Sequence, residues 1–300
     1  MDKTKIIIDT DFGDDIDDAL AIAFALESPE LEVLGITTVF KNVTARAKTA
    51  VRMLKMAGRE DIPVYTGIGS PIFNKVNQEE IPCQYSEEFD GKEDAFHLNG
   101  LDFLIDSVME SNNDITLVPI GPLTNIAIAI LKEPLLKKKV KEIVMMGGCY
   151  YNHCNEWNIR CDPEAARVVF ESGIPIKAVG LDVTYKCNLS KEDVEDIMSK
   201  GKPTASYLPE LIRRWRQGSD KCPMMHDPLA ICAIFDKTIL EMQQEEIVIE
   251  TQGEVMRGAT YNKSSLCWRG NADQSVIRVA KNVDPEAFIR LFMDRITDRV

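Results

Sequence analysis

Residues 6–26 read IIIDTDFGDDIDDALAIAFAL and contain the turn on which the fold depends. The three isoleucines at the start are typical of a strand, and the apolar run ALAIAFAL from Ala19 onward is typical of a buried helix. Between them the chain places Gly13, which suits a tight turn, and six aspartates: Asp9, Asp11, Asp14, Asp15, Asp17 and Asp18. The stretch predicts a strand that passes through an acidic turn into a helix.

The same alternation continues along the chain. Strand-like apolar runs recur at 31–40, 115–121, 141–148 and 174–183, and a helical pattern covers 44–57. Strands that alternate with helices predict an α/β protein with an open, mostly parallel sheet flanked by helices. We expect a single domain over residues 1–300.

A change of character follows in the second half of the chain. From about Ser190 to Gly218 the sequence is polar and helical, and Ser190 and Asp193 are spaced as in a capping box. This change predicts a helical insertion over the active site. In open α/β sheets that site lies at the carboxyl ends of the strands.

The composition excludes several classes of function. The chain has 35 basic and 48 acidic residues, a net charge of -13 and a pI near 4.8, which opposes contact with nucleic-acid phosphates. No apolar run is long enough to be a secretory signal or to span a membrane. We therefore expect no nucleic-acid or membrane partner, and a cytoplasmic location.

Eight cysteines are scattered over the chain without a CxxC pair. Without a secretory signal, this usage predicts reduced thiols rather than a disulfide framework. Cys149, His153, Cys154 and Cys161 lie near one another in the sequence, but their spacing is not that of a zinc finger. We expect no zinc site there.

The six aspartates need a cation. Carboxylates this close repel one another and raise each other's pKa, whereas a helix N-terminus supplies only about half a positive charge. A hard divalent ion with oxygen ligands relieves the repulsion, and flexible coordination by several carboxylates favours Ca²⁺. Helix capping alone would explain one or two aspartates, but not six.

Two other acidic motifs share parts of this pattern. An EF-hand loop beginning at Asp9 would need glutamate at its twelfth position, where the chain has Leu20. A metal-dependent phosphatase of the haloacid dehalogenase type also begins with an apolar strand and DxD, and would use Asp9 as nucleophile and Asp11 as acid and base. That class continues with a small residue and threonine, whereas Phe12 and Gly13 follow here. The phosphatase is kept as the alternative.

Four motifs are spaced along the chain: DTDFGDDIDDA at 9–19, VPIGPLTNIA at 118–127, MGG with EWNIRCDPEAA within 146–166, and MHDPLA at 225–230. Together they resemble the inosine-uridine preferring nucleoside hydrolase family. The resemblance implies a Rossmann-like nucleoside hydrolase fold and an enzyme that hydrolyses the N-glycosidic bond of a small-molecule ribonucleoside, giving ribose and a free nucleobase. It also implies bound Ca²⁺ and a homodimer or homotetramer.

The resemblance implies roles for individual residues as well. It makes Asp11 the general base that takes a proton from a calcium-bound water. It assigns the metal to Asp11, Asp18, the backbone carbonyl of Ile120, and Asp227, and the ribose to Asp17, Asn42, Glu156 and Asn158. The acidic turn is two residues longer than the commonest form of the family, so Asp14 and Asp15 could replace Asp17 and Asp18. The later pair is preferred because it keeps the DDA at the helix start intact.

A departing nucleobase needs a proton, and His226 resembles the leaving-group acid of the family. The alternative is a structural histidine turned away from the site, and His97 and His153 are weaker candidates. Relatives with a broad or pyrimidine preference usually carry another histidine in the region corresponding to 70–96, where this chain has none. A non-catalytic ribose-binding homologue is a further reading, although intact Asp11 and His226 argue against it.

Three tryptophans are candidates for contact with the substrate. Trp157, between Glu156 and Asn158, is predicted to shape the ribose pocket. Trp215 either stacks on the base or packs in the core, and packing is favoured for Trp268.

Overall fold

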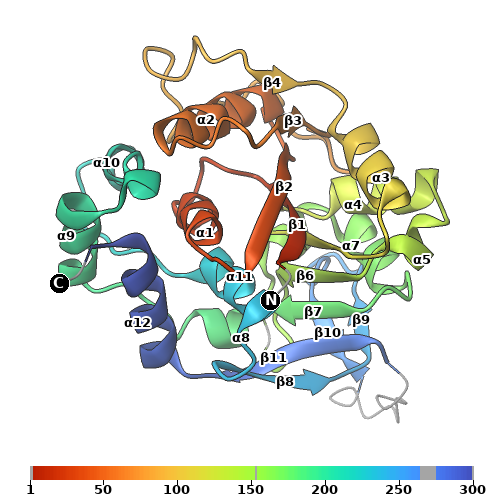
Figure 1. Ribbon diagram of the computed structural model, residues 1–300. Coiled ribbons are helices and arrows are strands. Elements are labelled where there is room, and N and C mark those ends of the chain that lie inside the picture. Colours follow the sequence, from red (N-terminus) through yellow and green to blue (C-terminus); the bar gives the residue numbers. More distant parts are fainter. Residues whose placement is uncertain (1–2, 153, 264–274, 299–300) are drawn as a thin grey trace.

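The computed structural model describes residues 3–152, 154–263 and 275–298, and its centre is a sheet (Figure 1). Within those ranges the sheet has nine strands in the order β4-β3-β2-β1-β5-β6-β7-β11-β8. The strands are β1 Thr4–Thr10, β2 Leu31–Thr38, β3 Val64–Thr66, β4 Phe96–His97, β5 Ile115–Pro119, β6 Glu142–Met146, β7 Ile176–Val179, β8 Leu240–Gln244 and β11 Ile277–Val283. All neighbouring pairs are parallel except β11 with β8. The predicted open, mostly parallel sheet is confirmed.

The central strand β1 contributes to two hydrophobic cores. Ile6 and Ile8 belong to one core and Ile7 belongs to the other, because successive side chains of a strand point to opposite faces of the sheet. All three side chains are fully buried. A strand that is apolar on both faces has to be covered by helices on both sides.

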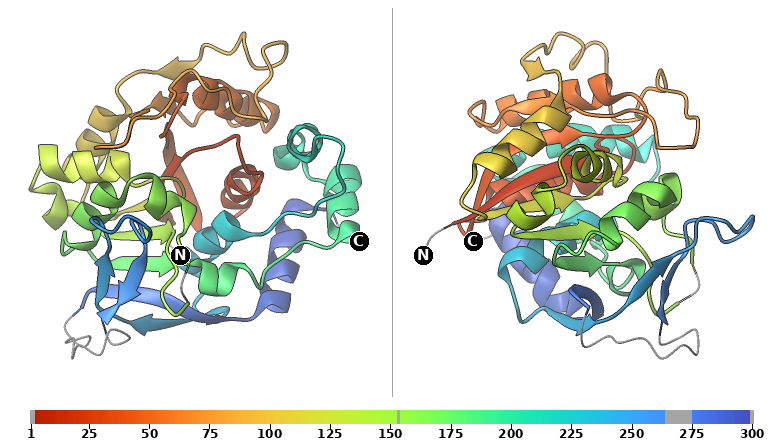
Figure 2. Two further views of the ribbon diagram at one scale, coloured as in Figure 1. Left: turned by 180° about the vertical axis from the view of Figure 1, so that it is seen from behind. Right: turned by 90° about the vertical axis from the view of Figure 1, so that its right-hand side faces the viewer.

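Helices form these two covering layers (Figure 2). One layer contains α1 Asp17–Leu26, α2 Val43–Met56, α8 Leu181–Thr184, α9 Lys191–Lys200, α10 Leu208–Arg216, α11 His226–Phe235 and α12 Pro285–Ile296. The other contains α3 Gly100–Glu110, α4 Thr124–Lys132, α5 Leu136–Lys139, α6 Trp157–Cys161 and α7 Pro163–Phe170. A small antiparallel pair, β9 Ile247–Ile249 and β10 Thr260–Asn262, lies outside the main sheet. The helical segment predicted for 190–218 is α9, a 3-10 turn at Pro203–Ala205, and α10, and the Ser190–Asp193 capping box is present.

The site-forming loops follow from this topology. Parallel strands end at the same edge of a sheet, so the segments after β1, β2, β5 and β6 come together there. These segments contain the acidic turn, the turn before α2, the loop around Ile120, and the loop that leads to Glu156. Among the helices of the described ranges, none is both long and apolar enough to cross a membrane.

One prediction about the cysteines is wrong. Cys149 and Cys154, five residues apart in the loop after β6, form a disulfide, whereas the sequence predicted reduced thiols. The loop folds back so that the two Cα atoms are 6.0 Å apart, and linear spacing does not reveal such a turn. The pairing also removes both thiols from any zinc cluster, while His153 and Cys267 lie outside the described residues. The other cysteines of the described ranges are free: Cys83, Cys161, Cys187, Cys222 and Cys232.

Candidate active site

A cavity with a volume of about 640 Å³ lies at the carboxyl edge of the sheet. It brings together ten of the eleven residues predicted from the sequence: Asp11, Asp17, Asp18, Ile120, Glu156, Trp157, Asn158, Trp215, His226 and Asp227. These residues come from segments as far apart in the chain as those of Asp11 and Asp227. The fold therefore assembles one site from the four motifs.

Three aspartates form the most acidic part of the cavity wall. Asp17 and Asp18 occupy the first turn of α1, and Asp227 occupies the first turn of α11. All three are buried, and one carboxylate oxygen from each lies within 4.8 Å of the others. Burial raises the pKa of each carboxyl well above its usual value, and repulsion from neighbouring aspartates raises it further. This oxygen-only group could bind a metal ion, because a cation would remove both penalties.

Asp11 lies beside this group and is held through its backbone by Arg46 of α2. Arg46 is fully buried and donates hydrogen bonds to the carbonyl oxygens of Asp11, Phe12 and Phe40. Its Nη2 also pairs with Oδ2 of Asp14 at 2.8 Å. Burial raises the pKa of Asp11 to about 6, while the positive charge of Arg46 opposes the rise. Sequence reasoning missed Arg46, whose only signal was a lone arginine between two small apolar residues of α2.

The extended acidic turn separates its aspartates into different environments. Asp14 is exposed and paired with Arg46, and exposed Asp15 accepts a hydrogen bond from the backbone N–H of Ile16. Asp17 and Asp18 are instead buried next to Asp227. This arrangement favours the later pair for the metal and ribose roles.

Asp9 lies beneath the cavity and does not line it. Its Oδ1 accepts hydrogen bonds from Oγ1 of Thr37 at 2.5 Å and from Nδ2 of Asn125 at 2.7 Å. Burial raises the pKa of Asp9 to about 7. A fully buried carboxyl in these contacts is placed to hold β1, β2 and α4 together, not to attack a phosphoryl group.

Glu156 and Asn158 form an ordered wall on the other side of the cavity. Glu156 caps α6, and its two oxygens accept hydrogen bonds from the backbone N–H groups of Gly148, Asn158 and Ile159. Burial raises the pKa of Glu156, and these three donors oppose the rise. The Nδ2 of Asn158 donates to the carbonyl of Ile120 at 2.9 Å, which fixes that carbonyl at the cavity wall.

Asn42 is the one predicted residue that the structure does not bring into the cavity. Its Oδ1 caps α2 by accepting from the N–H of Ala45 at 3.0 Å. The two preceding residues, Phe40 and Lys41, have φ values of 68° and 55°. Lys41 lines the cavity instead and forms an ion pair with Glu80 at 2.5 Å. The motif located the correct turn, but its left-handed backbone decides which side chain reaches the site.

His226 lies at the first position of α11 and lines the cavity. Its Nδ1 is 2.7 Å from Oγ1 of Thr184, and its ring packs edge-on against Tyr185. Burial lowers the pKa of His226. Because Thr184 engages Nδ1, the second ring nitrogen is left for a ligand. His97, by contrast, lies on β4 against Tyr65 and does not line the cavity.

Aromatic and amide groups complete the wall. Trp215 of α10 is buried with 8% of its surface exposed, and the Nζ of Lys221 lies 4.0 Å from its ring centroid. Trp157 is half exposed and carries the guanidinium of Arg160 over its ring. Asn155 was not predicted. Within the described ranges its buried Oδ1 has no hydrogen-bond partner. Trp268 lies outside those ranges.

Comparison with known proteins agrees with the four motifs. A family model described as inosine-uridine preferring nucleoside hydrolase matches residues 6–290. The chain is 34% identical to the probable uridine nucleosidase 2 of Arabidopsis thaliana, with 99% of the chain and 98% of the relative covered. It is 33% identical to the pyrimidine-specific ribonucleoside hydrolase RihA of Escherichia coli O127:H6, with 97% of each covered.

Two solved structures match the whole fold. A plant nucleoside hydrolase has a TM-score of 0.84 at 30% identity, with 99% of each chain covered. A purine-preferring ribonucleoside hydrolase from Gardnerella vaginalis has a TM-score of 0.82 at 30% identity, with 97% of each chain covered. The names of these relatives divide between pyrimidine and purine preference, so similarity alone does not select a base.

Proposed function

The chain belongs to the inosine-uridine preferring nucleoside hydrolase family, and from this membership we propose how its cavity works. The enzyme hydrolyses the N-glycosidic bond of ribonucleosides and releases a free nucleobase. One observation carries the residue assignments: a general-base candidate, a group of buried carboxylates and a histidine line the same cavity.

The family is metal-dependent, and we assign Ca²⁺ to this site. Asp11, Asp18 and Asp227 would hold the ion with carboxylate oxygens, and Ile120 would add its backbone carbonyl. An all-oxygen set rich in carboxylates suits calcium, and burial together with repulsion from neighbouring aspartates raises the pKa of Asp18 and of Asp227, a penalty that a cation would remove. When bound, the ion supplies that charge and makes water more acidic.

We assign the proton-accepting role to Asp11. Its backbone is fixed by buried Arg46, so its carboxylate keeps a set place in the cavity. Asp11 accepts a proton from the attacking water, and the surrounding aspartates stabilise the positive charge that develops on the ribose. Asp17, Glu156 and Asn158 orient the sugar hydroxyls by hydrogen bonds, and Trp157 shapes this side of the cavity.

We assign protonation of the leaving base to His226 and stacking on that base to Trp215. The contact between Thr184 and Nδ1 sets the ring so that Nε2 is available to the base. Burial lowers the pKa of His226 below its usual value of about 6.5, so its protonated form is lost as the pH rises through a range below neutral. In the profile of activity against pH, the rise on the acid side should therefore report ionisation of Asp11, which must be charged. The fall on the alkaline side should report loss of the proton of His226.

Replacing His226 with glutamine is expected to lower kcat by about 10²-fold on nucleosides, since general acid catalysis contributes about 10²–10⁴. A 4-nitrophenyl riboside leaves without protonation, so its kcat should fall less than about fivefold, well below the general-acid contribution. The alkaline limb of the pH profile should disappear in the variant. Equal losses on both substrates would show that His226 has another role.

The structure gives the phosphatase reading no support, because the required nucleophile Asp9 lies outside the cavity. We further propose one domain over 1–300, assembled as a homodimer or homotetramer. A cytoplasmic location stays a prediction: five described cysteines are free, whereas the Cys149–Cys154 disulfide is of a kind that is rare in a reducing cytosol.

The reaction is tested by measuring reducing sugar released from inosine, adenosine, guanosine, uridine and cytidine in the presence of Ca²⁺. Release of ribose from at least one of them is expected, and the rates would rank the bases. Both the pyrimidine and the purine outcomes fit the named relatives. No release from any member of the panel would contradict the assignment of ribonucleosides as substrates.

A further inference from the structure

A segment outside the four motifs packs directly on the acidic turn. This covering segment, residues 82–93, lies between β3 and β4. The backbone N–H of Gln84 donates to the carbonyl of Gly13 at 2.9 Å, and its side chain donates to the carbonyl of Asp15. A Cβ added at Gly13 would lie 2.8 Å from Cβ of Pro82. The covering segment therefore has a fixed position relative to the acidic turn.

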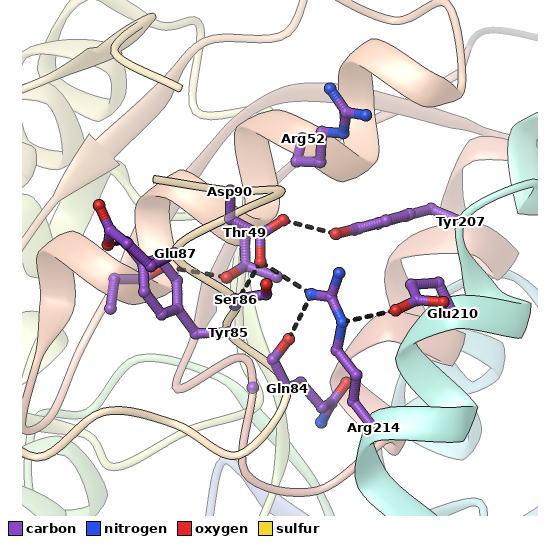
Figure 3. Close-up of polar contacts among 12 residues, drawn as sticks. Thr49, Arg52, Gln84, Tyr85, Ser86, Glu87, Asp90, Tyr207, Glu210 and Arg214 are labelled. Atoms are coloured by element: carbon purple, nitrogen blue, oxygen red, sulfur yellow. Dashed lines mark hydrogen bonds and ion pairs between the residues drawn. The ribbon is translucent and has the colours of Figure 1, made fainter. Parts of the chain in front are cut away.

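A buried ion pair ties the covering segment to α10 (Figure 3). Asp90 is fully buried, and its Oδ2 accepts from Nη1 of Arg214 at 2.8 Å and from the N–H of Ser86 at 2.8 Å. Its Oδ1 accepts from the hydroxyl of Tyr207 at 2.5 Å. Arg214 also donates to the carbonyl of Gln84 at 2.7 Å. One carboxylate thus joins the covering segment to both ends of α10, because Tyr207 precedes the helix and Arg214 lies in its last turn.

The arginine of this pair is the chain neighbour of Trp215. Consecutive side chains of a helix are separated by about 100°, so Arg214 contacts the covering segment while Trp215 lines the cavity. The side chain of Arg214 is 11% exposed, and its Nε is held by Glu210 at 2.9 Å. Anchoring Arg214 fixes the rotation of α10 about its axis, and with it the direction of the Trp215 ring.

A buried ion pair is a costly way to stabilise a fold, because apolar side chains of similar size do so at least as well. Its directional hydrogen bonds instead select one arrangement of the parts that it joins. We propose that the Arg214–Asp90 pair is a positioning device for Trp215 that sets affinity for the nucleobase without touching the substrate. The proposal rests on the proposed stacking of Trp215 on the base.

The test is a double-mutant cycle on the full-length, Ca²⁺-loaded enzyme, with Arg214→Met, Trp215→Ala and the double variant. Each single change should raise KM for the best nucleoside roughly tenfold, equivalent to about 1.4 kcal/mol, with kcat altered less than about threefold, under 0.7 kcal/mol. The double variant should be no worse than Trp215→Ala. Inhibition by free ribose should be unchanged in all three variants, because the residues proposed to bind ribose, Asp17, Glu156 and Asn158, do not include Trp215.

Two further variants separate positioning from folding. Arg213→Met removes the neighbouring arginine, whose side chain is 58% exposed, and should leave KM at the wild-type value. Arg214→Lys keeps the charge but not the planar fork of donors, so it should restore only part of the affinity. If Arg214→Met unfolds the chain, Asp90→Asn replaces it in the cycle, because asparagine keeps an acceptor for Tyr207 at nearly the same volume.

The outcomes distinguish the positioning role of the Arg214–Asp90 pair from the stacking role of Trp215. KM increases that multiply in the double variant, or a ribose inhibition constant that rises in parallel, would overturn positioning through Trp215. An unchanged KM in Trp215→Ala would overturn the stacking assignment and the positioning role together. Wild-type turnover of the nucleoside remains the control for the reaction itself.

Discussion

The Asp11→Asn variant is expected to lose about 10³-fold or more in kcat, with KM changed much less. Asparagine has the same shape but cannot accept a proton, and general base catalysis contributes about 10²–10⁴. The variant also removes one negative charge from the place where positive charge develops in the transition state. Because Asp11 is buried and its pKa is raised to about 6, the neutral side chain should not destabilise the fold. Single-turnover rates and thermal unfolding would be measured together.

Asp15→Asn is the matched control for this prediction. It lies in the same acidic turn but is exposed and bonded to the adjacent backbone N–H, so its kcat should stay within about threefold of wild type, less than 1 kcal/mol in activation free energy. Asp18→Asn should instead follow Asp11→Asn. Near-normal turnover in Asp11→Asn would remove the general base from the mechanism. A severe loss in Asp15→Asn with a mild loss in Asp18→Asn would move the catalytic roles to the earlier pair of aspartates.

The sequence alone predicted the parts of the site that are formed by one continuous stretch of chain. The strand, acidic turn and helix of residues 6–26 need only the periodicity of the apolar residues and the density of carboxylates. The meeting of Asp17 and Asp18 with Asp227 was implied only by the resemblance to the family, because α11 follows α10 and not a strand of the parallel sheet. Burial of Ile6 to Ile8 on both faces follows from the parallel topology.

The features that sequence reasoning missed depend on contacts between distant segments. Arg46 reads as one more helical residue until the fold places it under the acidic turn. Asn42 has the right motif, yet its side chain is used as a helix cap. Asp90 and Arg214 are 124 residues apart, and neither belongs to a motif. A polar side chain in a surface-like sequence context gives no sign that a second segment will bury it.

Removing the metal is the second change with a large expected effect. A chelator that binds divalent ions should lower turnover by more than about 10³-fold, because the metal supplies several kcal/mol of charge stabilisation. Adding Ca²⁺ back should restore the activity. Turnover that is insensitive to the chelator would contradict the assignment of the metal, while restoration by Mg²⁺ alone would contradict the choice of calcium.

The same metal should change stability in a way that depends on pH. Without a cation, burial holds the pKa values of Asp17, Asp18 and Asp227 well above the usual value near 3.9. A carboxyl whose pKa is higher in the folded state stabilises the fold below its unfolded pKa, and this contribution is lost as the pH rises through the folded pKa. The metal-free enzyme should therefore lose stability as the pH rises above about 4, the pKa of the unfolded carboxyls.

A bound cation favours the charged carboxylates and reverses this trend. The increase in melting temperature caused by Ca²⁺ should then be small at pH 5 and large at pH 8, since protons compete for the same oxygens. At 100 times the dissociation constant, ligand binding adds about 2.7 kcal/mol, or roughly 5 °C for a chain of this size. Asp227→Asn should reduce this increment at pH 8, whereas Asp15→Asn should preserve it. An increment that is equal at pH 5 and pH 8 would mean that the ion does not bind at these buried carboxylates, because binding there must compete with protons.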